Sequence, residues 1–475
     1  MQTQQPNGGC LTPTSIASSP SYKRASIVHW ADLAESTGDI AEKEADDISS
    51  TGISESVDPV DASGYRTPNG NTRSDGVTSK PETNGSVRAD GGLKERRKAG
   101  FQRARATDYP PLSNAAGREA AARERDRMNA YRAGGIRFAP WNIPYRRRLQ
   151  TMAVLVHSLS IAVTFSFFFF LCANPLLWPL LIPYLLHMLL SKSAVDGRLR
   201  ARSERFRRHS VWKFFSGYFP AQLHKTHDLP PTRKYIFGYH PHGIISHGAF
   251  AAFCTEALGF SEKFPGITNS LLTLDSNFRI PLYRDYILAM GIQSVSKESI
   301  QAILTRGGPN GEGMGRAVTI VVGGARESLA AQPGTMHLVL AQRKGFVKMA
   351  MRTGADLVPV LAFGENDLYD QVSPQQHPLL HSAQMWVLRT LKFTLPFLHG
   401  RGIFNYDVGL MPYRRPLNVV VGRPIPVRQA REAEGIESRE VERLHAEYVG
   451  ELERMWETYK DVFATERKEE MKIIS

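Results

Sequence analysis

Residues 234–243 have the sequence KYIFGYHPHG, in which an apolar run of strand length ends in two histidines on either side of a proline. Further runs of strand length follow: AVTIVV (317–322), DLVPVLAF (356–363) and LNVVVG (417–422). Helix-like stretches separate these runs, for example at 296–304 and 345–354. This alternation predicts an α/β fold with a mainly parallel sheet and flanking helices.

The last part of the chain predicts an amphipathic helix. Apolar residues recur there at spacings of three and four, and they are Val441, Leu444, Tyr448, Leu452, Met455, Tyr459 and Phe463. Glu and Arg stand between them, so only one face of the helix is apolar. Together with the strands, this helix completes a predicted α/β domain at residues 227–475.

A long uncharged segment precedes this domain. Residues 149–191, 43 in all, contain no Asp, Glu, Lys or Arg, whereas one membrane helix needs about 20 apolar residues. Asn174 and Pro175 divide the segment, and basic residues flank both of its ends. Because positive charge stays on the cytosolic side, we expect a membrane-embedded helical hairpin within residues 136–191, with both ends in the cytosol. The second arm contains Pro183 and is short, so a spanning and a re-entrant arm both stay open, and a buried soluble hairpin is the alternative.

Composition bounds the remaining segments. Residues 1–135 are predicted to form a disordered polar tail, because apolar periodicity is not sustained there. Residues 192–226 are predicted to be a basic linker at the membrane surface.

The net charge of +13 suggests a polyanionic partner, which could be nucleic acid, an anionic membrane or a phosphorylated ligand. The three cysteines lie far apart, which excludes a disulfide framework and a cysteine zinc site.

The histidines after the first strand allow three interpretations. Their spacing could place two imidazoles on one side of an extended segment as metal ligands, with His247 as a third, but the chain has no HExxH motif. A neutral imidazole with a pKa of about 6.5 could instead take a proton from an alcohol, which would make His240 or His242 a general base. The third interpretation is a structural pair at a strand end. The chain has neither a GxSxG nucleophile motif nor a P-loop.

Three motifs follow the histidines in order. They are NFRIPLYRD (277–285), VVGGARESL (321–329) and LVPVLAFGE (357–365). A histidine on a loop, then a Gly/Glu/Arg segment that ends a strand, then a strand with Val-Pro, resembles the layout of the glycerolipid acyltransferases. More closely, the chain resembles the type 2 diacylglycerol acyltransferase family, which includes monoacylglycerol acyltransferases and wax-ester synthases. We expect a fungal member of that family.

This resemblance covers roughly residues 136–465 and rests on motif matches. The family's Tyr-Phe-Pro motif matches Tyr218, Phe219 and Pro220, and its His-Pro-His-Gly motif matches His240, Pro241, His242 and Gly243. Its long signature matches Arg343, Gly345, Phe346, Lys348, Ala350, Gly354, Val358, Pro359, Phe363, Gly364 and Glu365. The segments HGRG (399–402) and VVVGRPIPV (419–427) are also similar.

The resemblance implies an activity and a setting. The activity is transfer of a fatty acyl group from acyl-CoA to the free hydroxyl of diacylglycerol, which gives triacylglycerol. No metal and no cofactor are expected, since fatty acyl-CoA is a substrate. The expected partners are the lipid bilayer, diacylglycerol and acyl-CoA, with no nucleic acid, and a homo-oligomer is an option. The expected location is the endoplasmic reticulum membrane with a cytosolic catalytic domain, and the lipid-droplet surface as a second location.

The resemblance also implies roles for single residues. His242 is the expected general base, and His240 would orient it or share its role. Backbone N–H groups near Gly243 would stabilise the oxyanion. Glu327 is expected to orient an imidazole or to hold the substrate.

Substrate-binding residues are expected at two places. Arg343, Lys344 and Lys348 would meet the phosphates of CoA, and the Tyr-Phe-Pro motif at 218–220 would shape the membrane-side wall. Within the same family, the alternative is a monoacylglycerol or wax-alcohol acyltransferase. Outside it, the alternatives are a membrane-anchored metal-dependent lipid hydrolase and a non-catalytic lipid-binding protein.

Overall fold

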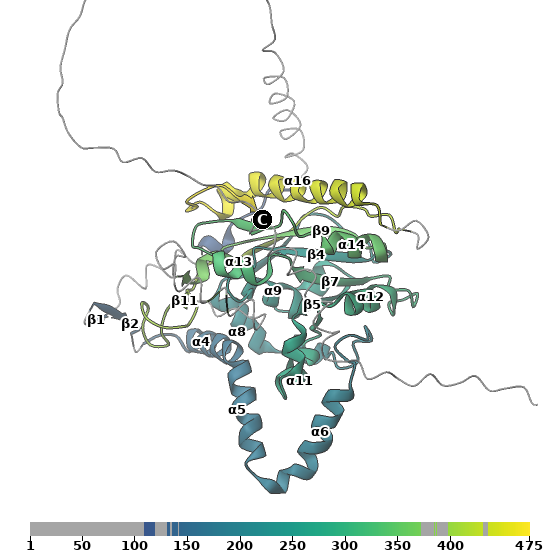
Figure 1. Cartoon of the computed structure of the whole chain (residues 1–475). Helices are drawn as coiled ribbons and strands as arrows, with labels where there is room; N and C mark the ends of the chain where they lie inside the picture. The colour runs from purple at the N-terminus through teal and green to yellow at the C-terminus, as the bar shows by residue number, and fades with distance from the viewer. Residues whose placement is uncertain are drawn as a thin grey trace, which may run out of the picture. The chain divides into compact units, whose positions relative to one another are not determined.

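The computed structural model describes residues 109–118, 131–133, 135–140, 142–371, 384, 386, 398–430 and 436–475. All of these residues belong to one compact unit, Ser86–Ser475, which Figure 1 includes. The disordered tail predicted at 1–135 lies for the most part outside the described residues.

A seven-stranded sheet forms the centre of this unit, in the order β3-β12-β9-β4-β7-β5-β6. Its strands are β3 (Gln222–Lys225), β4 (Tyr235–His240), β5 (Thr268–Thr273), β6 (Gln293–Ser294), β7 (Arg316–Val321), β9 (Asp356–Phe363) and β12 (Asn418–Val421). Every neighbouring pair is parallel except β9 and β12, which are antiparallel. The prediction of an α/β fold with a mainly parallel sheet is therefore confirmed.

The sequence predicts some strands of the sheet more clearly than others. Strands β4, β7, β9 and β12 start and end within one residue of the predicted apolar runs. Strands β3, β5 and β6 were not predicted, because QLHK and TNSLLT mix polar and apolar residues and β6 has only two residues. These three become strands through pairing with a neighbour, which local sequence does not encode.

Side chains from the central strands pack on both faces of the sheet. In β4, Phe237 and Tyr239 join one hydrophobic core and Ile236 joins the other, as the alternation of side chains along a strand requires. The first core lies under α4 (Tyr145–Ser158), α8 (Ser210–Tyr218), α9 (His247–Ala249), the π-helical turn η2 (Phe250–Cys254), α10 (Phe260–Lys263) and α11 (Tyr283–Ala289). The second lies under α12 (Lys297–Thr305), α14 (Gly345–Thr353) and α16 (Ser438–Phe463).

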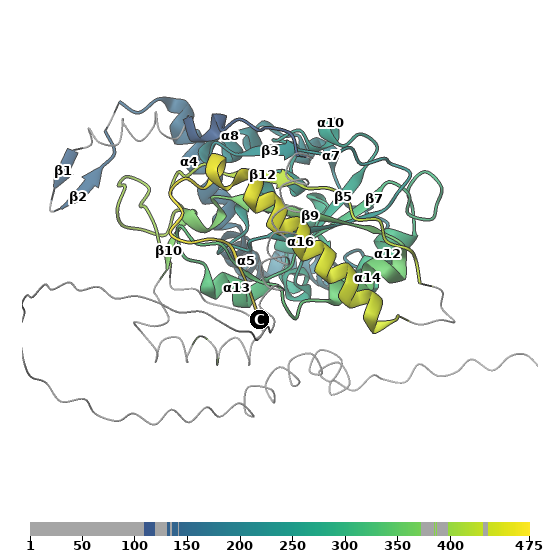
Figure 2. The same ribbon diagram turned by 90° about the horizontal axis from the view of Figure 1, so that it is seen from above.

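The predicted amphipathic helix corresponds to α16, which lies across the sheet above β9 (Figures 1 and 2). Six of its seven predicted apolar positions are at most 2% exposed, namely Val441, Leu444, Tyr448, Leu452, Met455 and Tyr459. The seventh, Phe463, is partly buried against the same core. The apolar face of α16 therefore closes one side of the sheet.

Shorter elements surround the sheet. They are α7 (Glu204–Arg207), α13 (Gly324–Ala330), the 3-10 turns η1 (Pro175–Leu177), η3 (Asp275–Arg279) and η4 (Glu365–Leu368), and three two-stranded pairs: β1 (Tyr131–Ala133) with β2 (Ile136–Phe138), β10 (Asp370–Gln371) with β11 (Leu398–His399), and β8 (His337–Val339) with β13 (Lys472–Ile474). The α13 and η4 elements follow β7 and β9 directly, which places them at the carboxyl ends of two central strands.

The uncharged segment forms two helical arms, α5 (Ser160–Cys172) and α6 (Trp178–Leu190), which project from the sheet domain in Figure 1. Apolar side chains of both arms are exposed: Phe170 of α5 is 72% exposed and Leu189 of α6 is 77% exposed. Among the described residues no single helix meets the length and hydropathy expected of a membrane span, whereas α4 and α5 meet it together, with a bend of 64° between them. Embedding of the hairpin in a membrane stays a prediction.

The predicted linker at 192–226 contains structured elements. Strand β3 lies within it and pairs with β12 in the central sheet. Arg207 of α7 is 0% exposed and forms ion pairs with Glu204 at 2.8 Å and Glu256 at 3.0 Å. At least this arginine of the basic stretch is thus neutralised inside the protein. The predicted domain boundaries stay a prediction.

Truncating the buried face of α16 should destabilise the fold. Leu452 is 0% exposed, so Leu452→Ala leaves a cavity against the sheet, and we expect a loss of about 2–5 kcal/mol. Glu453→Ala on the exposed side of the same helix is the matched control, with an expected change within about 0.5 kcal/mol. Thermal unfolding in detergent micelles measures both variants. Equal midpoints for the two variants would contradict the packing of α16 on the sheet.

Candidate active site

The carboxyl ends of three adjacent parallel strands meet at one edge of the sheet. Strand β4 lies between β9 and β7, and all three run in the same direction. The His-Pro-His-Gly loop follows β4, α13 with Glu327 follows β7, and η4 with Glu365 follows β9. In open α/β sheets, ligands bind at the carboxyl ends of the strands. The sheet order therefore places a carboxylate on each side of the histidine loop.

His242 is partly buried, and one of its ring nitrogens has a defined partner. Its Nδ1 lies 2.9 Å from the carbonyl oxygen of Gly243. Because a carbonyl only accepts, Nδ1 must carry the proton and donate, which leaves the lone pair on Nε2. Among the described residues Nε2 has no hydrogen-bond partner. Burial lowers the pKa of His242, so the imidazole is neutral at pH 7. A neutral imidazole with its lone pair on Nε2 can accept a proton.

His240 has a different environment, although it is only two residues away. It is 0% exposed, and its Nε2 lies 3.0 Å from the hydroxyl of Tyr448 on α16. That hydroxyl donates to the carbonyl of Gly238 at 3.0 Å, so it accepts from His240 Nε2. The Nδ1 atom of His240 is buried without a partner. Burial, with the charge of His445 as a smaller cause, lowers the pKa of His240 to about 3. His240 thus joins the strand end to α16.

Glu327 holds the backbone of the histidine loop, not an imidazole. It is 1% exposed, and one carboxylate oxygen accepts the backbone N–H of His242. The other oxygen accepts the N–H of Val339 in β8 at 2.7 Å. Burial raises the pKa of Glu327 to about 7, against the two N–H donors and the charge of Arg343, which favour the carboxylate. Both oxygens are therefore committed as acceptors.

A second buried carboxylate, Glu365, lies on the other side of the loop. It is 2% exposed, and its Oε2 accepts the Tyr239 hydroxyl at 2.7 Å and the N–H of Gly248 at 2.8 Å. Its Oε1 is buried without a partner. Gly243 has a φ of +58°, and a Cβ there would come within 2.6 Å of the Glu365 side chain, so glycine is required at this contact.

Sequence reasoning did not assign a role to Glu365. The residue appeared only as the end of the long signature, because nothing local marks it as facing the histidines. The one signal was its position just after β9, and that signal needs the pairing of β9 with β4 to be interpreted.

The Tyr-Phe-Pro motif lies inside the protein. Tyr218 and Phe219 are both 0% exposed. The Tyr218 hydroxyl donates to the carbonyl of Pro412 at 2.6 Å, and the Phe219 ring lies 5.0 Å from the His247 ring. His247 is 1% exposed, with its Nε2 at 3.3 Å from the Tyr369 hydroxyl.

Among the described residues no group of three His, Cys, Asp or Glu side chains is placed to hold a metal ion.

The basic residues predicted to meet CoA face two different acidic residues. Arg343 acts electrostatically on Glu327, beside the histidine loop. Lys344 Nζ lies 2.6 Å from a carboxylate oxygen of Glu442 on α16, and Lys348 is exposed on α14, where it also acts on Glu442. Arg343 thus acts on a residue of the candidate site, and a role of the three residues in binding CoA stays a prediction.

These features define an α/β protein with one accessible imidazole base between two buried carboxylates. The model of the diacylglycerol acyltransferase family matches residues 168–474. Diacylglycerol O-acyltransferase 2A of Umbelopsis ramanniana is 48% identical over 340 residues, which are 71% of this chain and 94% of the relative. The 2-acylglycerol O-acyltransferase 1 of Bos taurus is 44% identical over 341 residues, 70% of this chain and 98% of the relative. The chain therefore belongs to the diacylglycerol acyltransferase family, as its motifs predicted.

One solved structure also resembles the chain. It is the 1-acyl-sn-glycerophosphate acyltransferase of Thermotoga maritima, with a TM-score of 0.30 and 13% identity over 65% of this chain and 97% of that one. At this score the likeness supports no argument.

The two buried carboxylates should respond differently to the same substitution. In Glu327→Gln the amide nitrogen would face a backbone N–H, so one bond is lost and two donors oppose each other. In Glu365→Gln the amide oxygen can keep both partners of Oε2, while the NH2 occupies the position of the unpartnered Oε1. We expect a fall in kcat of about 10-fold or more for Glu327→Gln and less than about 3-fold for Glu365→Gln. Acyl transfer by the two purified variants measures this, and equal losses would contradict it.

Glu365→Gln also tests the charge of this carboxyl. Burial raises the pKa of Glu365 to about 7 in the folded protein, above the value of about 4.3 for an unfolded Glu. Between these values the folded state binds the proton more tightly, so this contribution to stability is lost as the pH rises towards 7. Gln cannot ionise, so the thermal midpoint of the variant should rise relative to wild type between pH 5 and pH 8. A difference that is the same at both pH values would contradict the raised pKa.

Proposed function

We propose that the chain is an acyl-CoA:diacylglycerol O-acyltransferase that makes triacylglycerol. Family membership supports an acyltransferase activity, and the Umbelopsis ramanniana relative is named for diacylglycerol. The Bos taurus relative is named for 2-acylglycerol, so a monoacylglycerol acceptor is the second candidate. The observation that carries the proposal is the lone pair of His242 Nε2, at the edge of the sheet where substrates bind.

In the proposed reaction, His242 Nε2 takes the proton of the acceptor hydroxyl as its oxygen attacks the thioester carbonyl. The hydrogen bond that Nδ1–H donates to the carbonyl oxygen of Gly243 stabilises the imidazolium that forms. The tetrahedral intermediate then expels CoA as a thiolate, which takes the proton back from Nε2. Because a thiol has a pKa of about 8.5, no stronger acid is required.

The oxyanion requires N–H donors close to the base. The N–H of Gly243 has no acceptor among the described residues, which makes it our candidate donor. Glu327 acts on the neighbouring peptide, because its bond to the N–H of His242 holds the loop in place. In this proposal Glu327 is a positioning residue, and His240 supports the loop through Tyr448. The thioester carries its own activation, so the proposal includes no metal and no cofactor.

The hairpin supplies the proposed contact with the lipid phase. Apolar side chains cover both arms, and they face outwards. The base of the hairpin is tied to the sheet domain, because the Tyr184 hydroxyl of α6 donates to Asp285 of α11 at 2.5 Å and accepts the N–H of Leu282 at 2.8 Å. In Figure 1, α11 lies between the bases of α5 and α6. An acceptor dissolved in the bilayer and a donor from the cytosol could thus meet at one domain. The proposed location is the endoplasmic reticulum membrane, with the lipid-droplet surface as a second location.

The proposal predicts different outcomes for the two neighbouring histidines. His242→Ala removes the base, so we expect kcat to fall by about 10²- to 10⁴-fold while the protein folds. His240→Ala removes a buried contact to α16, so its main effect should be a lower thermal midpoint. Exposed His209, replaced by Ala, is the control with near-normal activity.

The assay uses labelled acyl-CoA with diacylglycerol, monoacylglycerol or a long-chain alcohol as acceptor, in membranes with equal protein levels. Near-normal triacylglycerol synthesis by the His242→Ala variant would contradict the general-base role. A wild type that prefers monoacylglycerol would select the second candidate function.

The pH profile should follow the neutral form of the base. Because burial lowers the pKa of His242 below its ordinary value of about 6.5, the base is unprotonated at pH 7. We expect kcat/KM for acyl-CoA to be level from pH 7 upwards and to fall only below about pH 6.5. An acid limb with an apparent pKa above 7 would contradict this assignment, and repeating the profile with Glu365→Gln removes one other group that titrates nearby.

A further inference from the structure

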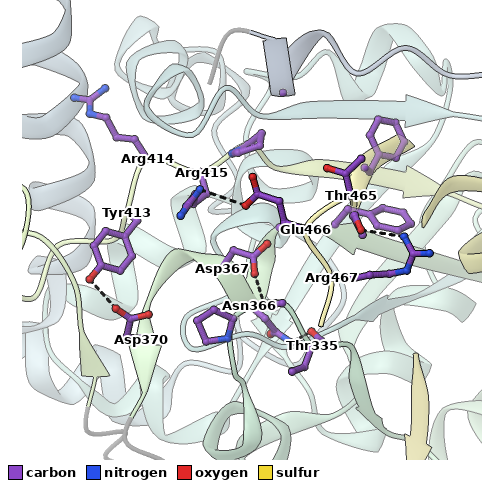
Figure 3. Close-up of a pocket in the computed structure, with 18 of the residues that line it drawn as sticks. Thr335, Asn366, Asp367, Asp370, Tyr413, Arg414, Arg415, Thr465, Glu466 and Arg467 are labelled. Atoms are coloured by element: carbon purple, nitrogen blue, oxygen red, sulfur yellow. Dashed lines mark hydrogen bonds and ion pairs between the residues drawn. The ribbon is translucent and has the colours of Figure 1, made fainter. Parts of the chain in front are cut away.

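A cavity of about 980 Å³ lies beside the active-site edge, and the proposed reaction has not yet used it. Segments far apart in the chain line it: residues 333–336, the turn η4, the segment 413–416 and the segment 464–468 that follows α16 (Figure 3). A volume of this order is typical of a site for a small-molecule substrate. The His-Pro-His-Gly loop does not line it, so the cavity could serve a part of the substrate that does not react.

Positive charge prevails in the cavity. Its basic lining residues are Arg137, Arg147, Arg401, Arg414, Arg415, Arg467 and Lys468, and its acidic ones are Asp367, Asp370, Asp407 and Glu466. The acids are engaged by the protein: Asp367 accepts the N–H of Gly334 at 2.7 Å, Asp370 accepts the Tyr413 hydroxyl at 2.8 Å, and Asp407 pairs with Arg137. Arg415 and Glu466 are 3.9 Å apart at the exposed rim. Some of the bases are paired as well, namely Arg137 with Asp407, and Arg467 with Asp461 at 2.9 Å and Glu470 at 3.1 Å. The lining itself still has more basic than acidic residues, which favours an anion.

Arg401 is the strongest indication of an anionic ligand. It is 5% exposed, and within the described part of the chain no carboxylate pairs with it. Its Nε donates to the carbonyl of Gly402 at 3.1 Å, and its guanidinium lies 4.9 Å from the centre of the Tyr406 ring. A buried charge without a counter-ion is costly, so an anion in the cavity that Arg401 lines would stabilise it.

The Tyr-Phe-Pro motif connects these arginines to the active site. The Arg414 guanidinium lies 4.1 Å from the centre of the Tyr218 ring, and the charge of Arg401 acts on the Tyr218 hydroxyl. Arg414 is also anchored to α4, where it donates to the Thr151 hydroxyl at 2.8 Å. The next residue, Phe219, packs on His247 beyond the His-Pro-His-Gly loop. Adjacent residues of one motif thus contact the arginines and the histidine segment.

Aromatic and amide groups complete the lining. Phe363 and Trp456 line the cavity and stack with ring centres 5.8 Å apart at 10°. Asn366 donates to the carbonyl of Thr335 at 3.0 Å, while its Oδ1 is buried without a partner. Aromatic rings, an unpaired amide oxygen and several arginines together suit a base attached to phosphates.

The turn η4 separates the cavity from the reacting groups. Gly364, Asn366 and Asp367 line the cavity, while Glu365 of the same turn contacts Gly243 and Tyr239 beside the base. A ligand held by its phosphates in this cavity would be next to the histidine loop.

We infer that this cavity binds the nucleoside-phosphate end of acyl-CoA and that the thioester extends from it to His242. The inference rests on the proposed function for the identity of the donor. It differs from the sequence-based expectation, which placed the phosphates at Arg343, Lys344 and Lys348.

Exposed residues of the cavity test the inference without endangering the fold. Arg415→Gln and Lys468→Gln each remove one positive charge at the rim. We expect the KM for acyl-CoA to rise by about 3- to 10-fold in each, with kcat within about 2-fold and an unchanged KM for diacylglycerol. Arg439→Gln, exposed on α16, removes the same charge elsewhere and should leave all three constants unchanged. Arg401→Lys, which keeps the charge but not the planar fork, should also raise the KM for acyl-CoA.

The same assay on Lys344→Gln and Lys348→Gln tests the sequence-based placement of the CoA phosphates against the cavity. An increased KM for acyl-CoA in these variants, with normal values for Arg415→Gln and Lys468→Gln, would overturn the inference. Adenosine 3′,5′-bisphosphate should raise the thermal midpoint of the full-length wild type and should do so less in the Arg415→Gln variant. If vesicles that contain phosphatidic acid raise the thermal midpoint and the nucleotide does not, the cavity holds a lipid phosphate and the inference is wrong.

The thermal measurement also separates this inference from the proposed function. It does not depend on turnover, so nucleotide binding that is lost with Arg415→Gln would support the cavity even if no acceptor is acylated. If the protein transfers acyl groups but wild type and the cavity variants do not differ in KM or nucleotide binding, the cavity is not the acyl-CoA site. The proposed function would then still stand.

Discussion

The active-site edge depends on one buried carboxylate, Glu327, which binds the loop after β4 and the end of β8 at the same time. Its oxygens accept the N–H groups of His242 and Val339, so the loop after β4 is bound to β8 through the helix that follows β7. Desolvation opposes this charge, and the donors favour it. Burying a carboxylate costs free energy. Glu327 stabilises the loop only while both of its hydrogen bonds to backbone N–H groups are kept.

Hydrogen-bond partners, rather than residue type, distinguish the two histidines. The carbonyl at Nδ1 leaves the lone pair of His242 on Nε2. In His240, Nε2–H donates to the Tyr448 hydroxyl, so the lone pair is on a buried Nδ1. The same side chain therefore has two tautomers within three residues. This assignment agrees with the exposure of the two rings, because only His242 is partly open.

Two different surfaces of the molecule suit the two halves of the proposed acyl transfer. The hairpin arms present mostly apolar side chains, while the arginine-lined cavity presents charge and aromatic rings. Tyr218 and Phe219 lie between the cavity and the histidine segment. This arrangement gives the buried Tyr-Phe-Pro motif a physical role, namely to hold two arginines and to pack against the segment that follows the base.

The sequence by itself determined the central strands β4, β7, β9 and β12, the amphipathic helix α16 and the family, because apolar periodicity and motif order are local properties of the chain. It did not predict β3, β5 and β6, whose polar or very short segments become strands only through their neighbours. Sequence also placed His240, His242 and Glu327 in one candidate site, but it did not separate the two histidines or reveal Glu365. Two of these distinctions arise from distant partners: Tyr448, 208 residues from His240, and Glu365, 126 residues from Tyr239. Only the tertiary structure decides them, since the order of strands in the sheet determines which distant groups meet at the end of β4.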